Sequence, residues 1–263
     1  MPKPVLTYDH VEVSYRGVPT VQDVSFAVCP GEVLGIVGES GSGKSTLLKA
    51  AMGQLGADGM VTRGDIWYKG RSLPDLSARE MRKLCGGDLA LVFQDCLAAL
   101  TPIRTIGDQI HESMTAHQRI SRAMSDERAT ALFAQLGLEQ PQRILNSYPF
   151  ELSGGMGQRV YIAMTLLCEP RVLLVDEPTS ALDVLAQNQV IELFSQVRTT
   201  TDAAMVLVTH NINVVRALAS NVLVLKSGRV VERGSTREVL THPTHPYTRQ
   251  LIDAAPKLAT LED

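Results

Sequence analysis

A phosphate-binding loop is the clearest chemical signal in this sequence. Residues 38–45 read Gly-Glu-Ser-Gly-Ser-Gly-Lys-Ser and match the pattern G-x-x-x-x-G-K-[ST] at every defined position. Glycines let successive backbone N–H groups face a polyphosphate, and the N-terminus of a following helix adds positive charge. Lys44 would reach the β- and γ-phosphates, and the Ser45 hydroxyl would ligate Mg²⁺. The loop therefore predicts a nucleotide site.

Two later apolar runs end in polar side chains of the kind that phosphate chemistry uses. Residues 171–176 lead into Asp176-Glu177, and residues 203–210 end in His210. Ligands gather where strands of a parallel sheet emerge at their carboxyl ends. There Asp176 suits Mg²⁺, Glu177 suits a general base for an attacking water, and His210 could contact the γ-phosphate. An ordinary acidic turn and a structural histidine are the alternative interpretations.

A second potential anion site lies at residues 152–158, Leu-Ser-Gly-Gly-Met-Gly-Gln. Ser153 followed by two glycines and a predicted helix is typical of an anion-binding helix N-terminus. Two phosphate cradles in a chain with one nucleotide indicate that the second cradle serves the nucleotide of another subunit.

The elements that must position these residues alternate between strands and helices. Alternation of this kind predicts an α/β fold with a mostly parallel sheet. A hairpin over residues 5–28, with Gly17 and Pro19 at its turn, precedes the phosphate loop. The strands are predicted at 32–38, 171–176 and 203–210, the helices at 158–168 and 184–197, an inserted helical region at 97–149 with a helix at 125–136, and a hairpin at 222–232.

Composition excludes several classes of protein. The chain has 263 residues, a net charge of −3 and 44% hydrophobic residues, so it can bury a core and has no basic footprint for nucleic acid. No apolar run approaches the roughly 20 residues of a transmembrane helix. The four cysteines form no CxxC pair. These features predict an intracellular globular protein without nucleic acid as partner.

Taken together, the phosphate loop, the 152–158 segment, the Asp-Glu strand end, Ser-Ala-Leu-Asp at 180–183 and His210 resemble an ATP-binding cassette (ABC) ATPase over nearly the whole chain. The resemblance implies a P-loop NTPase (RecA-like) core with an N-terminal antiparallel β subdomain and an inserted α-helical subdomain. The corresponding boundaries are 1–96 for the β subdomain plus P-loop core, 97–157 for the helical subdomain, 158–240 for the rest of the core and 241–263 for a C-terminal extension.

The resemblance also implies roles for individual residues. Tyr15 is similar to the aromatic residue that stacks on adenine, although a strand tyrosine packing on the hairpin is the alternative. Gln94 is similar to the glutamine that senses Mg²⁺ and water, and Asp183 to the acid that links two composite sites. The expected ATP contacts are Tyr15, Gly38, Glu39, Ser40, Gly41, Ser42, Gly43, Lys44, Ser45, Thr46, Ser153, Gly154, Gly155, Gln158 and Asp183. The expected catalytic residues are Lys44, Gln94, Glu177 and His210, and the expected Mg²⁺ ligands are Ser45, Gln94 and Asp176.

Two departures from the family pattern stand out. Gly157 replaces the bulkier residue common after the methionine of the signature, and residues 96–102 depart from the usual spelling just after the glutamine. Relatives use the latter region to contact the membrane partner, so this departure bears on partner choice. The chain is still expected to hydrolyse ATP because each catalytic position is intact.

Residues 242–249, His-Pro-Thr-His-Pro-Tyr-Thr-Arg, resemble the tail of ATPases from dipeptide, oligopeptide and nickel importers. Residues 163–170 and 182–187 are most similar to the nickel-type first ATPase. Many peptide-type relatives carry cysteines in their C-terminal region, whereas this sequence has none after Cys168. Nickel or a metal chelate is therefore the expected substrate, with a dipeptide or oligopeptide importer as the alternative and a non-transport ABC ATPase as a third class. His242 and His245 lack further ligands and make a poor metal site.

The resemblance implies several partners. They are a homologous second ATPase in a head-to-tail dimer, two transmembrane permease subunits and a periplasmic or extracellular substrate-binding protein. The expected location is the cytoplasmic face of the inner membrane, as a peripheral subunit. A small-molecule P-loop kinase is disfavoured because it has no use for residues 152–158.

Overall fold

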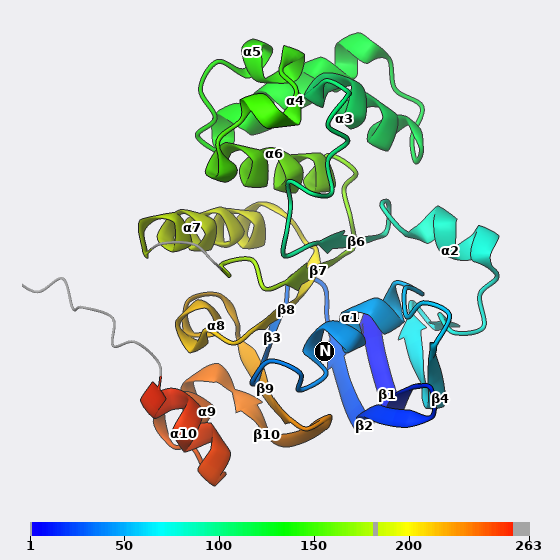
Figure 1. Ribbon diagram of the computed structural model, residues 1–263, viewed down its shortest axis with the longest axis vertical. Coiled ribbons are helices and arrows are strands. Elements are labelled where there is room, and N and C mark those ends of the chain that lie inside the picture. The colour runs from blue at the N-terminus through cyan, green and yellow to red at the C-terminus, as the bar shows by residue number, and fades with distance from the viewer. Residues whose placement is uncertain (1, 181–183, 255–263) are drawn as a thin grey trace, which may run out of the picture.

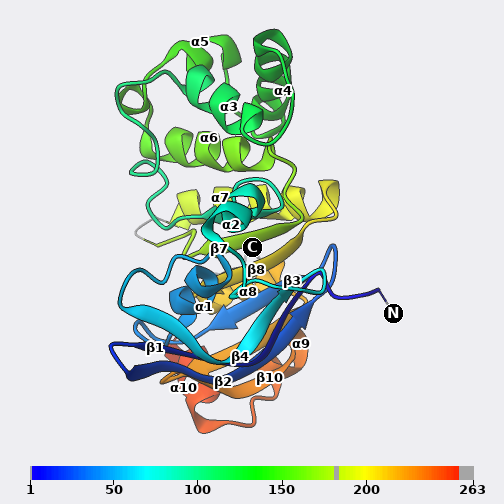
Figure 2. The same cartoon turned by 90° about the vertical axis from the view of Figure 1, so that its right-hand side faces the viewer.

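A computed structural model describes residues 2–180 and 184–254 (Figure 1). Three structural units are visible: a central sheet, an antiparallel sheet beside it, and a group of helices at one end of the molecule. The turn of 90° in Figure 2 leaves the helices α3, α4, α5 and α6 at that same end, so they form a separate layer. This is the ABC-type architecture that the sequence predicted.

The central sheet has the order β10-β9-β3-β8-β7-β6 and is parallel except for β10 at its edge. Its strands are β3 (Val33–Val37), β6 (Leu89–Val92), β7 (Val172–Asp176), β8 (Ala204–Thr209), β9 (Asn221–Lys226) and β10 (Arg229–Ser235). The inner strands read as continuous apolar runs because both of their faces are covered. In β3, Val33 and Val37 join one core cluster, whereas Leu34 and Ile36 join the other.

Helices from the same α/β units cover this sheet. They are α1 (Lys44–Ala51), α7 (Val184–Thr200) and α8 (Ile212–Leu218). Leu47 and Leu48 of α1 pack in one core cluster, and Val214, Val215 and Leu218 of α8 pack in the other. The two clusters therefore lie on opposite faces of the sheet, and they hold the strand ends in a fixed relation.

The antiparallel sheet has the order β2-β1-β4-β5. Its strands are β1 (Leu6–Tyr15), β2 (Val18–Val28), β4 (Gly59–Tyr68) and β5 (Arg71–Ser72). Arg16 and Gly17 form the hairpin turn with φ of 50° and 78°, as a type I′ turn requires. Pro19 was expected at this turn but lies inside β2, where an edge strand tolerates the missing N–H.

The helical layer interrupts the central sheet between β6 and β7. It contains α3 (Ile106–Thr115), α4 (Arg122–Gln135), α5 (Pro141–Asn146), a 3₁₀ turn at Pro149–Glu151 and α6 (Gly154–Leu166). Gly137, with φ of 65°, ends the α4 helix region as expected. The predicted boundary at residue 157 falls inside α6, because the 152–158 segment forms the first turn of a helix that continues.

Three more helices complete the described chain: α2 (Ala78–Leu84), α9 (Thr236–Thr241) and α10 (Pro246–Ala254). The predicted hairpin between β9 and β10 is present, with φ of 48° at Ser227 and 79° at Gly228. Within residues 2–180 and 184–254, no helix has the length and apolarity needed to cross a bilayer.

Candidate nucleotide site

The candidate site lies at the carboxyl edge of the central sheet, where three neighbouring strands end. In the parallel ladders Val37 of β3 pairs with Thr209 of β8, and Asp176 of β7 pairs with Val208 of β8. Lys44, Glu177 and His210 follow these strand ends within a few residues. The sheet topology thus brings together side chains that are far apart in sequence.

The phosphate loop needs glycine at two positions for different reasons. A Cβ on Gly38 would lie 2.1 Å from the carbonyl oxygen of Leu225, so the loop can pass β9 only without a side chain there. Gly43 has φ of 102°, in the left-handed region, and a Cβ there would lie 3.0 Å from the Thr20 carbonyl oxygen. The loop is consequently held between the β9–β10 hairpin and β2.

Lys44 is buried at the centre of this loop. Its Nζ donates to the carbonyl oxygens of Gly38 at 2.8 Å and Glu39 at 2.9 Å, and it lies 3.7 Å from Oε1 of Glu177. Burial lowers the pKa of the Lys44 ammonium, and the Glu177 carboxylate opposes that shift. The contacts hold the ammonium at the loop, where it can meet an incoming phosphate.

Ser45 and Asp176 form the oxygen-rich part of the site. The Ser45 hydroxyl donates to Oδ1 of Asp176 at 2.8 Å, across 131 residues of sequence. Burial raises the pKa of the Asp176 carboxyl, and the hydrogen bond from Ser45 opposes that shift. A hydroxyl and a carboxylate placed side by side are hard oxygen donors of the kind Mg²⁺ takes, so this pair fits the expected ion.

Glu177 connects Lys44 to His210. Its Oε2 lies 2.6 Å from Nδ1 of His210, and its side chain is 13% exposed, against 61% for His210. The backbone of Glu177 has φ of 47°, an uncommon conformation for a residue with a side chain. The carboxylate is thus held between an ammonium and an imidazole at the edge where a phosphate would sit.

The 152–158 segment starts α6, away from these strand ends. Ser153 caps the helix, since its Oγ accepts from the Met156 N–H at 3.3 Å, and Gly154 and Gly155 are exposed with open space around them. Gln158 behaves differently: its side chain is buried and donates to the Pro178 carbonyl at 2.7 Å. In this structure Gln158 ties α6 to the loop after Glu177 and does not face an open surface.

These features agree with the comparisons to known proteins. Residues 21–180 match the family described as "ABC transporter". The chain belongs to the ABC transporter family. Residues 231–263 match a second description, "Oligopeptide/dipeptide transporter, C-terminal region".

Relatives and solved structures extend this likeness to nearly the full chain. The dipeptide transport ATP-binding protein DppD of Bacillus subtilis (strain 168) is 40% identical over 97% of this chain and 77% of its own length. DppD of Escherichia coli (strain K12) is 42% identical over 91% and 73%. A dimeric ATP-binding cassette, MJ0796 bound to ADP and Pi, is 28% identical with a TM-score of 0.76, covering 88% of this chain and 99% of its own. The protein is therefore an ATP-hydrolysing subunit of an ABC transporter.

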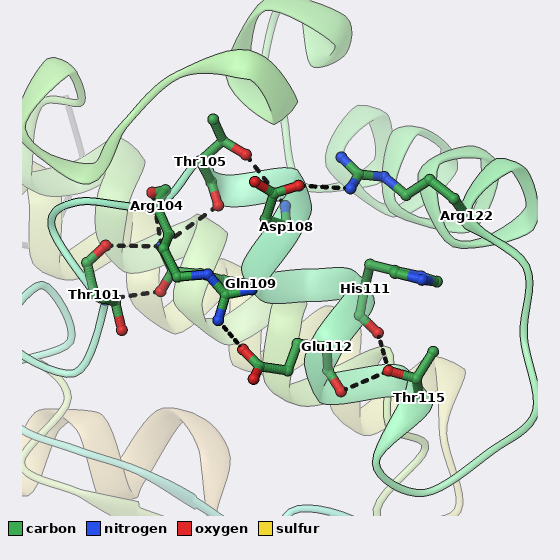
Figure 3. Close-up of polar contacts among 9 residues, drawn as sticks. All are labelled: Thr101, Arg104, Thr105, Asp108, Gln109, His111, Glu112, Thr115 and Arg122. Carbon is green, nitrogen blue, oxygen red and sulfur yellow. Dashed lines mark hydrogen bonds and ion pairs between the residues drawn. The ribbon is translucent and has the colours of Figure 1, made fainter.

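Gln94 lies in the exposed segment that follows β6. Within residues 2–180 and 184–254, Ser45 and Asp176 bond to each other and neither is hydrogen-bonded to Gln94. Figure 3 shows the hydrogen bonds that join residues 101–104 to α3: the buried Gln109 amide accepts from the Thr101 N–H at 2.7 Å and donates to the Thr101 and Arg104 carbonyls at 3.0 and 3.1 Å. This segment is thus fixed on α3.

The two departures from the family pattern meet in the structure. A Cβ on Gly157 would lie 2.1 Å from Cδ2 of Leu97, whose side chain packs against the larger core cluster. Gly157 in α6 therefore leaves room for Leu97, one of the residues after Gln94 that depart from the family pattern.

This complementarity makes a prediction about stability. Gly157→Ala is expected to destabilise the native chain by about 1 kcal/mol, because crowding of Leu97 exceeds the gain in helix propensity. In a Leu97→Ala background the same change is expected to stabilise by about 0.5 kcal/mol, since the space is then free. Urea unfolding of the four proteins measures the coupling. Strictly additive effects would show that the two side chains do not interact.

Tyr15 and Asp183 are two further residues that were predicted to contact ATP. Tyr15 ends β1, pairs with Val18, and is half-buried; a Cβ on Gly59 would lie 2.7 Å from its ring. The tyrosine therefore packs on the neighbouring strand at the end of the sheet, and adenine stacking stays a prediction. Asp183 lies outside the described residues.

Tyr247 contacts the site although no motif of the sequence indicates it: its hydroxyl oxygen accepts from the Glu39 N–H at 2.9 Å. The two residues are 208 positions apart. The His-Pro-Tyr spelling marks the start of a helix, but no local pattern indicates which loop such a tyrosine will contact.

Proposed function

We propose that this ABC ATPase powers the import of dipeptides or oligopeptides. The observation that carries the proposal is the match of residues 231–263 to the C-terminal region of oligopeptide and dipeptide transporters. The named relatives at 40% and 42% identity, both dipeptide transport proteins, support it. Nickel, the substrate expected from residues 163–187, is not favoured by these comparisons. The relatives extend beyond the aligned region, so the lack of cysteines after Cys168 does not separate the two branches.

ATP would bind at the phosphate loop of residues 38–45. Lys44 and the backbone N–H groups of residues 41–46 contact the β- and γ-phosphates, and Ser45 and Asp176 are the residues that would hold Mg²⁺. Bound there, the ion would neutralise charge on the phosphates. Gln94 joins this set only if residues 93–96, which precede the part held by Gln109, move toward the phosphates. Tyr15 would stack on the adenine at the end of β1.

Hydrolysis would depend on Glu177. Its carboxylate accepts a proton from a water molecule as the water oxygen forms a bond to the γ-phosphorus. The bond between that phosphorus and the β–γ bridging oxygen breaks, and ADP and inorganic phosphate leave. His210, at 2.6 Å from the carboxylate, orients it and reaches toward the γ-phosphate.

A second ATPase subunit would complete the site. The exposed residues Ser153, Gly154 and Gly155 have their N–H groups at a helix N-terminus, where anions bind. In a head-to-tail dimer they would contact the nucleotide held by the partner, and Asp183 would link the two sites. The related cassette MJ0796 is dimeric, which supports the pairing of two ATPase subunits.

The membrane partners would contact the segment that follows Gln94. Ile103, in this segment, has 83% of its surface exposed, although the segment itself is fixed by Gln109. The resemblance to ABC ATPases places the permease contact on this segment, and docking there would cover the Ile103 side chain. The chain would then lie at the cytoplasmic face of the membrane as a peripheral subunit, with a separate binding protein delivering the peptide.

Uptake by intact cells tests this proposal. In a strain that lacks the gene, uptake of a radiolabelled dipeptide is expected to fall to background and uptake of ⁶³Ni²⁺ to stay at the level of the parent. Complementation with the native gene should restore peptide uptake, whereas complementation with Glu177→Gln should not. Loss of nickel uptake alone would overturn the peptide assignment in favour of the metal branch. Normal uptake of both would overturn the importer assignment as a whole.

A further inference from the structure

Glu232 of β10 holds one end of the C-terminal segment at residues 242–249 against the core. Glu232 of β10 accepts from the N–H and hydroxyl of Thr244 at 2.7 and 2.9 Å and from the N–H of His245 at 3.0 Å. Although partial burial raises the pKa of Glu232, these hydrogen bonds lower it to about 2, so the carboxylate is charged at neutral pH. Arg249 donates to the carbonyls of Pro243 and Thr244 at 3.1 and 3.3 Å.

The sequence His245-Pro246-Tyr247 then starts helix α10 in a defined direction. Nδ1 of His245 accepts from the Tyr247 N–H at 3.1 Å, as a cap does, and Pro246 occupies the first helical position, where no N–H is needed. Histidine and proline thus fix where the helix begins. Figure 1 shows the result: α10 lies beside α9 and the β9–β10 side of the central sheet.

The tyrosine in this segment points into the molecule. Tyr247 is only 3% exposed, and Nζ of Lys226, at the end of β9, lies 4.6 Å from the centre of its ring. Its hydroxyl oxygen accepts from the N–H of Glu39 at 2.9 Å. The side chain therefore reaches the outer surface of the phosphate loop.

Glu39 is held from two sides. Its N–H donates to Tyr247, and its carbonyl oxygen accepts from Nζ of Lys44 at 2.9 Å. The peptide between Gly38 and Glu39 also carries the other carbonyl that binds Lys44, at 2.8 Å. A change in the orientation of this peptide would therefore move the Lys44 ammonium.

We propose that Tyr247 is a positioning residue for nucleotide binding: its hydroxyl orients the Gly38–Glu39 peptide, and through it Lys44. Residues 242–249 are then an internal brace of the phosphate loop, and nucleotide affinity depends on how they are docked. The His-Pro-Tyr spelling serves this brace, since His245 caps α10 and Tyr247 contacts Glu39. Among residues 2–180 and 184–254, no group of three or more His, Cys, Asp and Glu side chains gathers to hold a metal.

The Tyr247→Phe change tests the proposal because it removes one hydroxyl and keeps the ring over Lys226. Titration calorimetry with ADP and Mg²⁺ measures affinity without hydrolysis. One hydrogen bond contributes about 1 kcal/mol net, so the dissociation constant for ADP is expected to rise three- to tenfold. In the transporter, KM for ATP should rise by a similar factor with kcat within twofold of the native value.

Tyr161→Phe is the matched control. The Tyr161 hydroxyl is also buried and donates to a backbone carbonyl, that of Leu91, at 3.1 Å, away from the phosphate loop. Both variants are expected to lower the melting temperature by a similar amount, but only Tyr247→Phe should weaken ADP binding. Equal affinity of Tyr247→Phe and the native chain would overturn the proposal and leave Tyr247 as a packing residue.

Glu232→Gln tests the brace at a distance from the loop. The change weakens the docking of Thr244 and His245 without touching Glu39, so it too is expected to raise the dissociation constant for ADP, by two- to fivefold. The double variant with Tyr247→Phe should bind ADP no more weakly than the product of the two changes. Unchanged affinity in Glu232→Gln would show that the segment does not act on the loop.

Discussion

The Glu177→Gln protein is expected to bind ATP as tightly as the native chain and to hydrolyse it at least 100-fold more slowly. Glutamine keeps the shape of the side chain but cannot accept the proton of the attacking water, and a positioned general base contributes about 10²- to 10⁴-fold to a rate. The side chain is mostly buried between Lys44 and His210, at 3.7 and 2.6 Å, so a glutamine there stays in place. In the transporter the variant should accumulate in an ATP-bound, closed dimer.

Phosphate release from the purified transporter and ATP binding to the same preparation measure the two halves of this prediction. Glu169→Gln is the matched control, because Glu169 is an exposed glutamate paired with Arg128 at 3.1 Å, outside the site. The control should hydrolyse ATP at the native rate. Turnover by Glu177→Gln within tenfold of the native value would remove Glu177 from the role of base and direct attention to His210.

Lys44→Ala is expected to weaken nucleotide binding by about 10- to 100-fold. Hydrogen bonds from a charged group are worth about 1.5–3 kcal/mol, and the ammonium is held at the loop by two carbonyls. Without it, the carboxylates of Asp176 and Glu177 face the phosphates with less opposing charge. In the protein without nucleotide, the unfavourable burial of the ammonium, which lowers its pKa, offsets much of the benefit of its hydrogen bonds. The free energy of unfolding should therefore change far less than the affinity for nucleotide.

Calorimetry with ADP and Mg²⁺ measures the affinity, and urea unfolding measures the stability. Lys83→Ala provides the comparison, since Lys83 is an exposed lysine near the end of helix α2, outside the site. It should bind ADP within twofold of the native chain. If Lys44→Ala also bound ADP within threefold, the phosphates would have to lie elsewhere than at this loop.

Much of the fold could be predicted from short segments of the sequence. The continuous apolar runs of β3, β7 and β8 follow from burial on both faces, and each of them emerged where expected to within one or two residues. The turn at Ser227–Gly228 follows from the backbone freedom of its residues. The strand-end residues Lys44, Glu177 and His210 meet because consecutive parallel strands share an edge.

Other elements could not be predicted because their signals are distributed over distant segments. β4 pairs with β1 from Leu6↔Tyr68 to Tyr15↔Gly59, and its polar face resembles that of many exposed segments. The boundary predicted at residue 157 falls inside α6, because residues 152–158 are both a phosphate cradle and the first turn of a longer helix.

The phosphate loop, its strand-and-helix setting and the residues that follow each strand could be read from local sequence, since these features depend on neighbours within a few positions. Three long-range contacts became visible in the folded chain alone: Gly157 accommodates Leu97, Gln158 bonds α6 to Pro178, and Tyr247 bonds to Glu39. These contacts join segments that are 20 to 208 residues apart. Side chains at such separations meet only after the sheet order and the helix packing are set, and no local periodicity records that geometry.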